Sequence, residues 1–146
     1  MNAWATVMLV AGGLFAGGAA SVAWSRVPIW RQMALPEFVG DFAQTLRRTD
    51  MIQPALLVTA VISAAAVAVT HDGDAAMLAA LGAAGLVLVL VASAAFLVPL
   101  QRRLIATPLE QPDAIEAMRR RWFRANLGRS VVSTIAFAVM VAAATV

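Results

Sequence analysis

The sequence predicts an all-α protein, a four-helix transmembrane bundle with amphipathic cytoplasmic arms. Three observations predict this fold class. Of the 146 residues, 62% are hydrophobic and 13% are charged, whereas a soluble domain has roughly 45–50% apolar and about 25% charged residues. Four long apolar runs each approach the roughly 20 residues that a helix needs to cross a bilayer. The basic residues are all arginine and gather mainly between these runs, where the headgroup region begins.

We expect one domain over residues 1–146, with spans at 3–24, 51–70, 75–98 and 123–146 and arms at 25–50 and 99–122. The first run could also be a signal peptide. It lacks a basic start and is longer than the roughly 7–15 apolar residues of such a signal, so we interpret it as a retained helix. Gly13, Gly17 and Ser21 recur at every fourth residue along it, which predicts a flat strip for close helix packing.

The first arm contains two helix breakers, Pro28 and Pro36. Pro36 is expected to begin a short helix, because proline is favoured in the first turn. In that helix Phe38, Phe42 and Leu46 share one face while the charged side chains stay in water. Such an amphipathic helix either lies along the membrane surface or caps the bundle.

The second arm is expected to separate the third span from the fourth helix. Pro99 is predicted to end the third span, and Pro112, followed by acidic residues, is predicted to start a helix that continues into the fourth. The first and third connections carry all nine of the arginines outside the spans, while the turn at His71 has none. The positive-inside rule then places both arms in the cytoplasm and both termini outside. We expect a multi-pass protein of a bacterial inner membrane.

Polar residues near the ends of the spans are the candidate site, because a buried polar group in a bilayer needs a partner or a cavity. Trp122, Asn126 and Arg129 fall on one stripe of the fourth helix. Arg129 either extends to the headgroups or turns inward. Asp50 and Gln53, at the start of the second span, should lie at the same membrane side. We therefore predict a polar substrate-binding cluster in which Asp50 pairs with Arg129 and Gln53 with Asn126.

Other kinds of site have little support. The chain has no cysteine and one histidine, so thiolate sites are excluded and zinc-ligand spacing is missing. His71, Asp72 and Asp74 could hold a cation weakly, but a solvated turn is the favoured interpretation. No phosphate-binding glycine loop or serine triad appears. We expect no metal, no cofactor and no nucleic-acid partner.

A family resemblance extends over nearly the whole chain. Four features carry it: the run Gly13 to Gly17 with Val27 and Pro28, the pair Gln53 and Pro54, the run Pro99 to Leu104, and the run Trp122 to Ser130. In these features the sequence resembles the anthrone-oxygenase-like family of small four-helix membrane proteins, whose bacterial members mostly have no assigned role. The resemblance implies the fold, and for some members an oxygenase activity.

Two positions depart from the family pattern. Gln101 stands where the family often has asparagine, and Asn126 stands where many members, including the fungal oxygenases, have histidine. If that histidine acts as a base in those relatives, an amide cannot replace it, because it has no nitrogen that titrates near neutral pH. The resemblance therefore favours the fold more strongly than the activity.

Three functions are compatible with the sequence. Glycine-lined helices and amphipathic arms are typical of an accessory subunit, in a homo-oligomer or a larger membrane complex. A binder of a small lipophilic molecule would use the polar cluster as its pocket. A metal-independent oxygenase acting on an anthrone-like or other phenolic substrate would use Arg129 to stabilise an oxyanion, Asn126 to orient it and Trp122 to stack on the ring. Membrane lipids are expected to surround the protein in each case.

Overall fold

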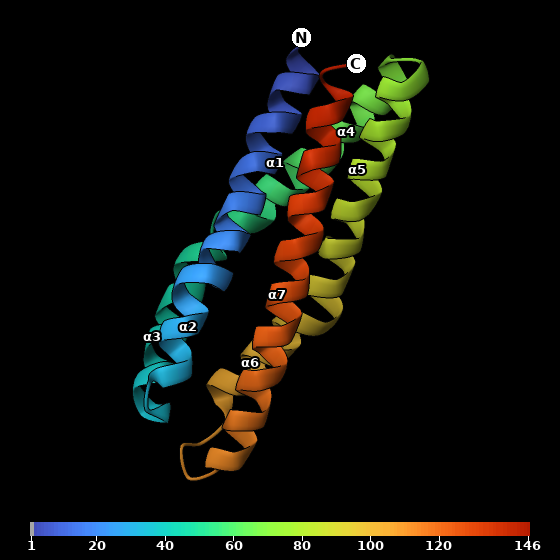
Figure 1. The fold of residues 1–146 in the computed structure, drawn as a ribbon. Coiled ribbons are helices and arrows are strands. Elements are labelled where there is room, and N and C mark those ends of the chain that lie inside the picture. Colours follow the sequence, from blue (N-terminus) through green and yellow to red (C-terminus); the bar gives the residue numbers. More distant parts are fainter. Residues whose placement is uncertain (1) are drawn as a thin grey trace.

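The computed structural model describes residues 2–146 as an all-α bundle, which confirms the predicted fold class (Figure 1). Four long helical segments make up the bundle. The first consists of α1 (Ala3–Ser21), the π-helical turn η1 (Val22–Arg26) and α2 (Val27–Gln32). The short helix α3 (Leu35–Thr49) leads into the second segment, α4 (Gln53–Thr70). The third comprises α5 (Gly73–Ala92), the π-helical turn η2 (Ser93–Leu97) and α6 (Val98–Ala106), and the fourth is α7 (Pro112–Ala143).

The four segments form a closed ring. Helix α1 packs against α4 and α7, and α5 packs against the same two helices. Both termini and the α4–α5 turn lie at one end of the bundle, and α2, α3 and α6 lie at the other (Figure 1). The two arginine-bearing arms therefore share one end, which we call the arginine-rich end.

The outer surface of the bundle is apolar. All four segments are long and apolar enough to cross a membrane. Large hydrophobic side chains are exposed on each of them, among them Leu14, Ile62, Leu88 and Ile135. So much exposed apolar surface is unfavourable in water and favourable among lipid tails. The chain is a multi-pass membrane protein.

Small residues bring the helices close together inside the bundle. A side chain at Gly12 or Gly82 would meet Met140 of α7, and one at Gly13 would meet the Phe137 ring. Gly17, by contrast, has open space beside it. The predicted strip of Gly13, Gly17 and Ser21 is therefore only partly correct, because α7 crosses α1 at Gly12 and Gly13 and leaves Gly17 uncovered.

Both proline predictions inside the long segments were wrong, since the helix continues through Pro28 and through Pro99. A proline removes one backbone donor and crowds the preceding turn. Here a π-helical turn comes just before each proline, and the amide of Val27 donates to the carbonyl of Val22, as Val98 does to Ser93. The wider turn absorbs the disruption, so the helix shifts its register instead of ending. Pro36 and Pro112 do begin helices, as predicted.

Helix α3 packs against the arginine-rich end of the bundle, which is the second of the two predicted arrangements. Its Phe38 and Phe42 pack with Trp30, Trp122 and Phe123, and we call these five residues the aromatic cluster. The Trp30 ring centroid lies 5.3 Å from that of Phe42 and 6.0 Å from that of Trp122, with edge-to-face geometry, which favours aromatic pairs. This packing ties α3 to both α2 and α7.

Candidate functional site

A cavity of about 200 Å³ lies where α1, α4, the η2–α6 segment and α7 meet. We call it the polar cavity, because five polar side chains line it: Asp50, Gln53, Ser93, Gln101 and Arg129. Its other walls are apolar and include Phe15, Leu57, Leu90 and Leu97. A pocket with mostly apolar walls and a few convergent polar groups is the usual form of a small-molecule site.

Local breaks in the helices bring these polar groups together. Asp50 caps the C-terminus of α3, and Gln53 is the first residue of α4, so the short α3–α4 connection places both at the mouth of the cavity. Ser93 begins η2, and Gln101 lies two turns further on in α6. The helix register shifts at η2, next to the cavity. π-Helical turns occur frequently at functional sites.

The charged residues of the cavity are each held by an amide. Gln101 Nε2 donates a hydrogen bond to Asp50 Oδ2 at 3.0 Å, and Arg129 Nη2 donates one to Asn126 Oδ1 at 2.8 Å. Within residues 2–146 no ion pair joins Asp50 to Arg129, and no hydrogen bond joins Gln53 to Asn126. The predicted pairings are replaced because Asn126 lies one turn before Arg129 on α7, and because α6 continues far enough for Gln101 to reach Asp50.

Three polar atoms around the cavity are buried without a partner among residues 2–146. They are Gln53 Oε1, Ser93 Oγ and Arg129 Nε, and all three residues line the cavity. A buried polar group left unpaired costs about 1–3 kcal/mol. Gln53 offers an acceptor, Arg129 a donor and Ser93 either one. A molecule that both donates and accepts hydrogen bonds would satisfy them.

Asp50 supplies the carboxylate of the cavity. Its partial burial raises the pKa of Asp50 above the ordinary value of 3.8, while the hydrogen bond from Gln101 and the positive charges of Arg129 and Arg102 oppose that shift.

Within residues 2–146 no group of three or more histidine, aspartate or glutamate side chains is placed to hold a metal ion.

A second hollow adjoins the polar cavity on the outside of the bundle. This apolar groove has a volume of about 340 Å³ and is lined by residues of α5, η2 and α7, among them Leu88, Phe96 and Gly128. Arg129 and Leu97 line both the groove and the polar cavity. Leu88 and Phe96 are also exposed on the outer surface. The two hollows therefore lie on either side of Arg129 and Leu97, and the groove faces the lipid.

The structure separates Trp122 from the other predicted site residues. Trp122 is 1% exposed and belongs to the aromatic cluster, and it does not line the polar cavity. Asn126 is fully buried and reaches the cavity through its bond to Arg129. The cavity brings together Asp50, Gln53 and Arg129. The stripe of α7 that carries Asn126 and Arg129 therefore extends beyond the cavity, and Trp122 at its far end belongs to the packing of the arginine-rich end.

Sequence reasoning missed two lining residues, Ser93 and Gln101. Ser93 is the one hydroxyl within the third apolar run, residues 75–98, and that isolation is a signal that could have identified it. Gln101 is 8% exposed. Because the helix was expected to end at Pro99, Gln101 was expected to lie in an exposed arm.

A known protein family matches the part of the chain that contains the polar cavity. Residues 42–139 match the family described as anthrone oxygenase, which is about two thirds of the 146-residue chain. The chain belongs to the anthrone oxygenase family. No curated protein and no solved structure matches it. All five polar residues that line the cavity, together with Asn126, lie within the stretch that matches the anthrone oxygenase family.

Proposed function

We propose that the polar cavity binds a small lipophilic molecule whose aromatic ring carries a hydroxyl group, as in a phenol. The observation that supports this most directly is the set of buried, unpartnered atoms Gln53 Oε1, Ser93 Oγ and Arg129 Nε around one cavity. A phenolic hydroxyl can donate to Gln53 and accept from Arg129 at the same time. The apolar walls suit the ring.

The size of the cavity limits what fits inside it. An apolar cavity of about 150 Å³ in another protein accepts benzene, and the polar cavity measures about 200 Å³. One ring with its oxygen substituent therefore fits within it. A molecule with several fused rings would extend past Arg129 into the apolar groove, where Gly128 leaves open space.

The apolar groove also offers a path from the membrane. A lipophilic ligand partitions into the bilayer, so its local concentration is higher there than in water. The groove faces the lipid, and Arg129 and Leu97 line both the groove and the cavity. In this proposal the ring arrives from the bilayer, and its hydroxyl donates to Gln53 and accepts from Arg129.

Binding of 1-naphthol to the protein in lipid nanodiscs, followed by equilibrium dialysis, tests the proposal. Replacing Arg129 by Gln removes a charge-assisted donor, and loss of such a bond costs about 1.5–3 kcal/mol, or roughly a tenfold to hundredfold weaker affinity. Arg121→Gln is the matched control, because Arg121 is exposed and lies outside the cavity. Equal affinity of the wild type and Arg129→Gln would refute the proposal.

An oxygenase reaction is the second candidate, and one specific observation favours it: a carboxylate and a guanidinium face the same cavity in a member of the anthrone oxygenase family. An anthrone has an acidic methylene next to its aromatic rings. Asp50 would accept one methylene proton, and Arg129 would stabilise the oxygen of the resulting enolate. Asp50 would then serve as the base that Asn126 cannot be.

The remaining chemistry belongs to the substrate and dioxygen. The enolate carbon reduces O₂ and forms a carbon–oxygen bond, which gives a hydroperoxide after protonation. The hydroperoxide loses its second carbon-bound hydrogen and releases water, so the methylene becomes a carbonyl. One O₂ is consumed, one of its atoms is retained in the quinone and the other leaves as water.

Oxygen uptake with anthrone as the substrate tests this second candidate separately from binding. A general base contributes about 10²–10⁴-fold to a rate, so Asp50→Asn should lose at least roughly a hundredfold of the catalysed rate. Glu37→Gln is the control, because Glu37 is an exposed carboxylate of α3 outside the cavity. If the wild type fails to accelerate uptake although it binds 1-naphthol, the oxygenase candidate is wrong and the binding proposal stands.

A further inference from the structure

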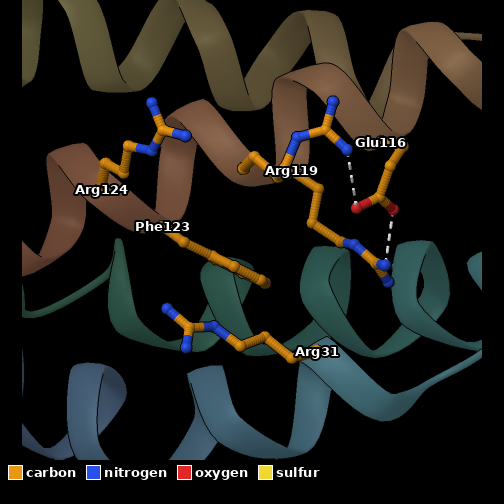
Figure 2. A pocket seen from close by; sticks show the side chains of 6 residues that line it. Arg31, Glu116, Arg119, Phe123 and Arg124 are labelled. Atoms are coloured by element: carbon orange, nitrogen blue, oxygen red, sulfur yellow. Dashed lines mark hydrogen bonds and ion pairs between the residues drawn. The ribbon is translucent and has the colours of Figure 1, made fainter.

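We propose that the seam between the first helical segment and α7 binds one anionic phospholipid at the arginine-rich end. The headgroup phosphate would occupy a cavity of about 320 Å³ in this seam. Arg31 of α2 lines the cavity together with Glu116, Arg119, Arg120, Phe123 and Arg124 of α7. Figure 2 shows the Phe123 ring between the side chains of Arg31 and Arg124. We call this hollow the arginine cavity.

The charges of the arginine cavity are only partly neutralised. Glu116 pairs with Arg119 at 2.5 Å and with Arg120 at 3.4 Å. Arg119 also donates to the backbone carbonyls of Trp30 and Met33, so its role is to fasten α2 to α7. Arg31 and Arg124 have no carboxylate partner within residues 2–146. One carboxylate faces four guanidinium groups, which leaves a strongly positive cavity.

Two free guanidinium groups on either side of an aromatic ring suit a phosphate. The Arg31 guanidinium lies 5.9 Å from the centre of the Phe123 ring, and this contact holds it over the cavity. The planar fork of arginine matches the oxygen atoms of a phosphate in two-point geometry. Basic pockets between membrane helices are recognised sites for anionic headgroups.

An apolar groove continues the same seam toward the middle of the membrane. It has a volume of about 210 Å³ and is lined by Trp24 of η1 and by residues of α7 that include Leu127, Val131 and Ile135. Trp24 is 73% exposed, although its indole has a large apolar surface. We call this hollow the acyl groove. It begins within one helical turn of Arg124.

The length of the seam matches one leaflet. Helix α7 rises 1.5 Å per residue, so Arg124 and Ile135 are roughly 16 Å apart along the helix axis. Half of a hydrocarbon layer of about 30 Å is 15 Å. A lipid with its phosphate between Arg31 and Arg124 would therefore place one acyl chain along Leu127, Val131 and Ile135 and beside Trp24. A free phosphate would leave the acyl groove empty, which is why we assign the seam to a lipid.

Fluorescence quenching by brominated lipids tests this proposal. Protein in nanodiscs receives phosphatidylglycerol or phosphatidylcholine with bromine on the acyl chains, and the quenching of tryptophan is measured. A Trp24→Phe variant identifies the part of the signal that comes from Trp24. We expect phosphatidylglycerol to quench Trp24 at a lower mole fraction than phosphatidylcholine does. Replacing both Arg31 and Arg124 by Gln should shift the half-quenching mole fraction of phosphatidylglycerol upward by roughly tenfold.

The matched control is the double variant Arg103→Gln with Arg121→Gln, which has the same change in charge outside the arginine cavity. Both arginines are exposed, and thermal unfolding shows whether either double variant is folded. The control should keep its half-quenching point within about twofold of the wild type. Three results would overturn the proposal: equal quenching by the two lipids, an equal loss in the control, or displacement of brominated phosphatidylglycerol by millimolar glycerol 1-phosphate.

Discussion

Asp50 and Arg129 face the same polar cavity, and each is held by an amide instead of by the other. Gln101 donates to Asp50, and Asn126 accepts from Arg129. A direct ion pair would neutralise both groups and close the space between them. Because the amides occupy only part of each group, the second oxygen of Asp50 and the Nε of Arg129 remain available to a ligand. This arrangement maintains opposite charges at one cavity.

The first prediction concerns pH. Burial raises the pKa of Asp50 above 3.8 in the folded protein, so the folded state holds this proton more tightly than the unfolded state. The free energy of unfolding should fall as pH rises from about 3.8 through the raised pKa of Asp50. Asp50→Asn removes this cost and can still accept the hydrogen bond from Gln101. We expect the variant to gain stability relative to the wild type as pH increases from 4 to 7.

Thermal unfolding of both proteins in the same detergent, at several pH values, measures this difference. Other carboxylates titrate in the same range, but they are common to both proteins and cancel in the comparison. Asp50→Asn and the wild type should unfold at the same temperature at the acid end of the series. A variant whose relative stability instead declined toward pH 7 would show that ionised Asp50 stabilises the fold.

The second prediction uses two adjacent glycines of α1. A side chain at Gly18 would meet the amide of Gln53, whereas one at Gly17 would meet nothing within 4 Å. Alanine at Gly18 should displace Gln53 from the polar cavity and weaken 1-naphthol binding severalfold. Alanine at Gly17 should leave binding unchanged, because its side chain would meet nothing. Both variants gain the same helix propensity, about 0.5–1 kcal/mol, so Gly17→Ala is the matched control. Equal affinities of the two variants would exclude Gln53 from the binding site.

The long helices were predictable from the sequence because a bilayer imposes a simple rule of length and apolarity. The face of α3 was predictable for a similar reason, since Phe38, Phe42 and Leu46 recur at helical spacing. The course of the chain through Pro28 and Pro99 was not. The π-helical turns before them depend on how the backbone rearranges its hydrogen bonds, and no residue pattern in a single sequence reports that rearrangement.

The candidate site was predictable in its charged members and not in its boundaries. Asp50, Gln53 and Arg129 are unusual at the ends of apolar runs, and this made them visible. Trp122 was predicted to join them because it lies on the same stripe of one helix as Arg129. Helix spacing does not show where along that stripe a cavity ends. Gln101 stood out in the sequence only as a departure from the family pattern, and its place at the cavity depends on the continuation of α6 beyond Pro99.

A third prediction tests the close packing of α5 against α7. A side chain at Gly82 would meet Met140 and lie 3.3 Å from the carbonyl oxygen of Ala136. The Met140 atom in the way is Cγ, which is held close to the α7 backbone and cannot swing aside, so Gly82→Ala should destabilise the bundle by about 1–3 kcal/mol. Gly128→Ala is the control, because that position has open space. Unfolding by titration with sodium dodecyl sulfate measures both, and a stable Gly82→Ala variant would mean that the helices separate at little cost.

The last prediction concerns how α3 is fastened to the bundle. Trp30 Nε1 donates to Asp41 Oδ2 at 2.6 Å, and Arg26 donates to Asp41 Oδ1 at 3.3 Å and to Thr45 at 3.0 Å. Asp41→Ala leaves the fully buried Trp30 without an acceptor for its indole, which costs about 1–3 kcal/mol. We expect the variant to unfold at a lower temperature and its α3 amides to exchange hydrogen faster.

Glu37→Ala provides the control for this change, because Glu37 is an exposed carboxylate on the same helix and forms no ion pair within residues 2–146. Hydrogen exchange detected by mass spectrometry resolves α3 from α4, so the effect can be assigned to the cap. If Asp41→Ala exchanged no faster than Glu37→Ala, the aromatic cluster alone would hold α3. Since Asp50 ends α3 at the mouth of the polar cavity, loosening α3 should also weaken 1-naphthol binding, and the control should not.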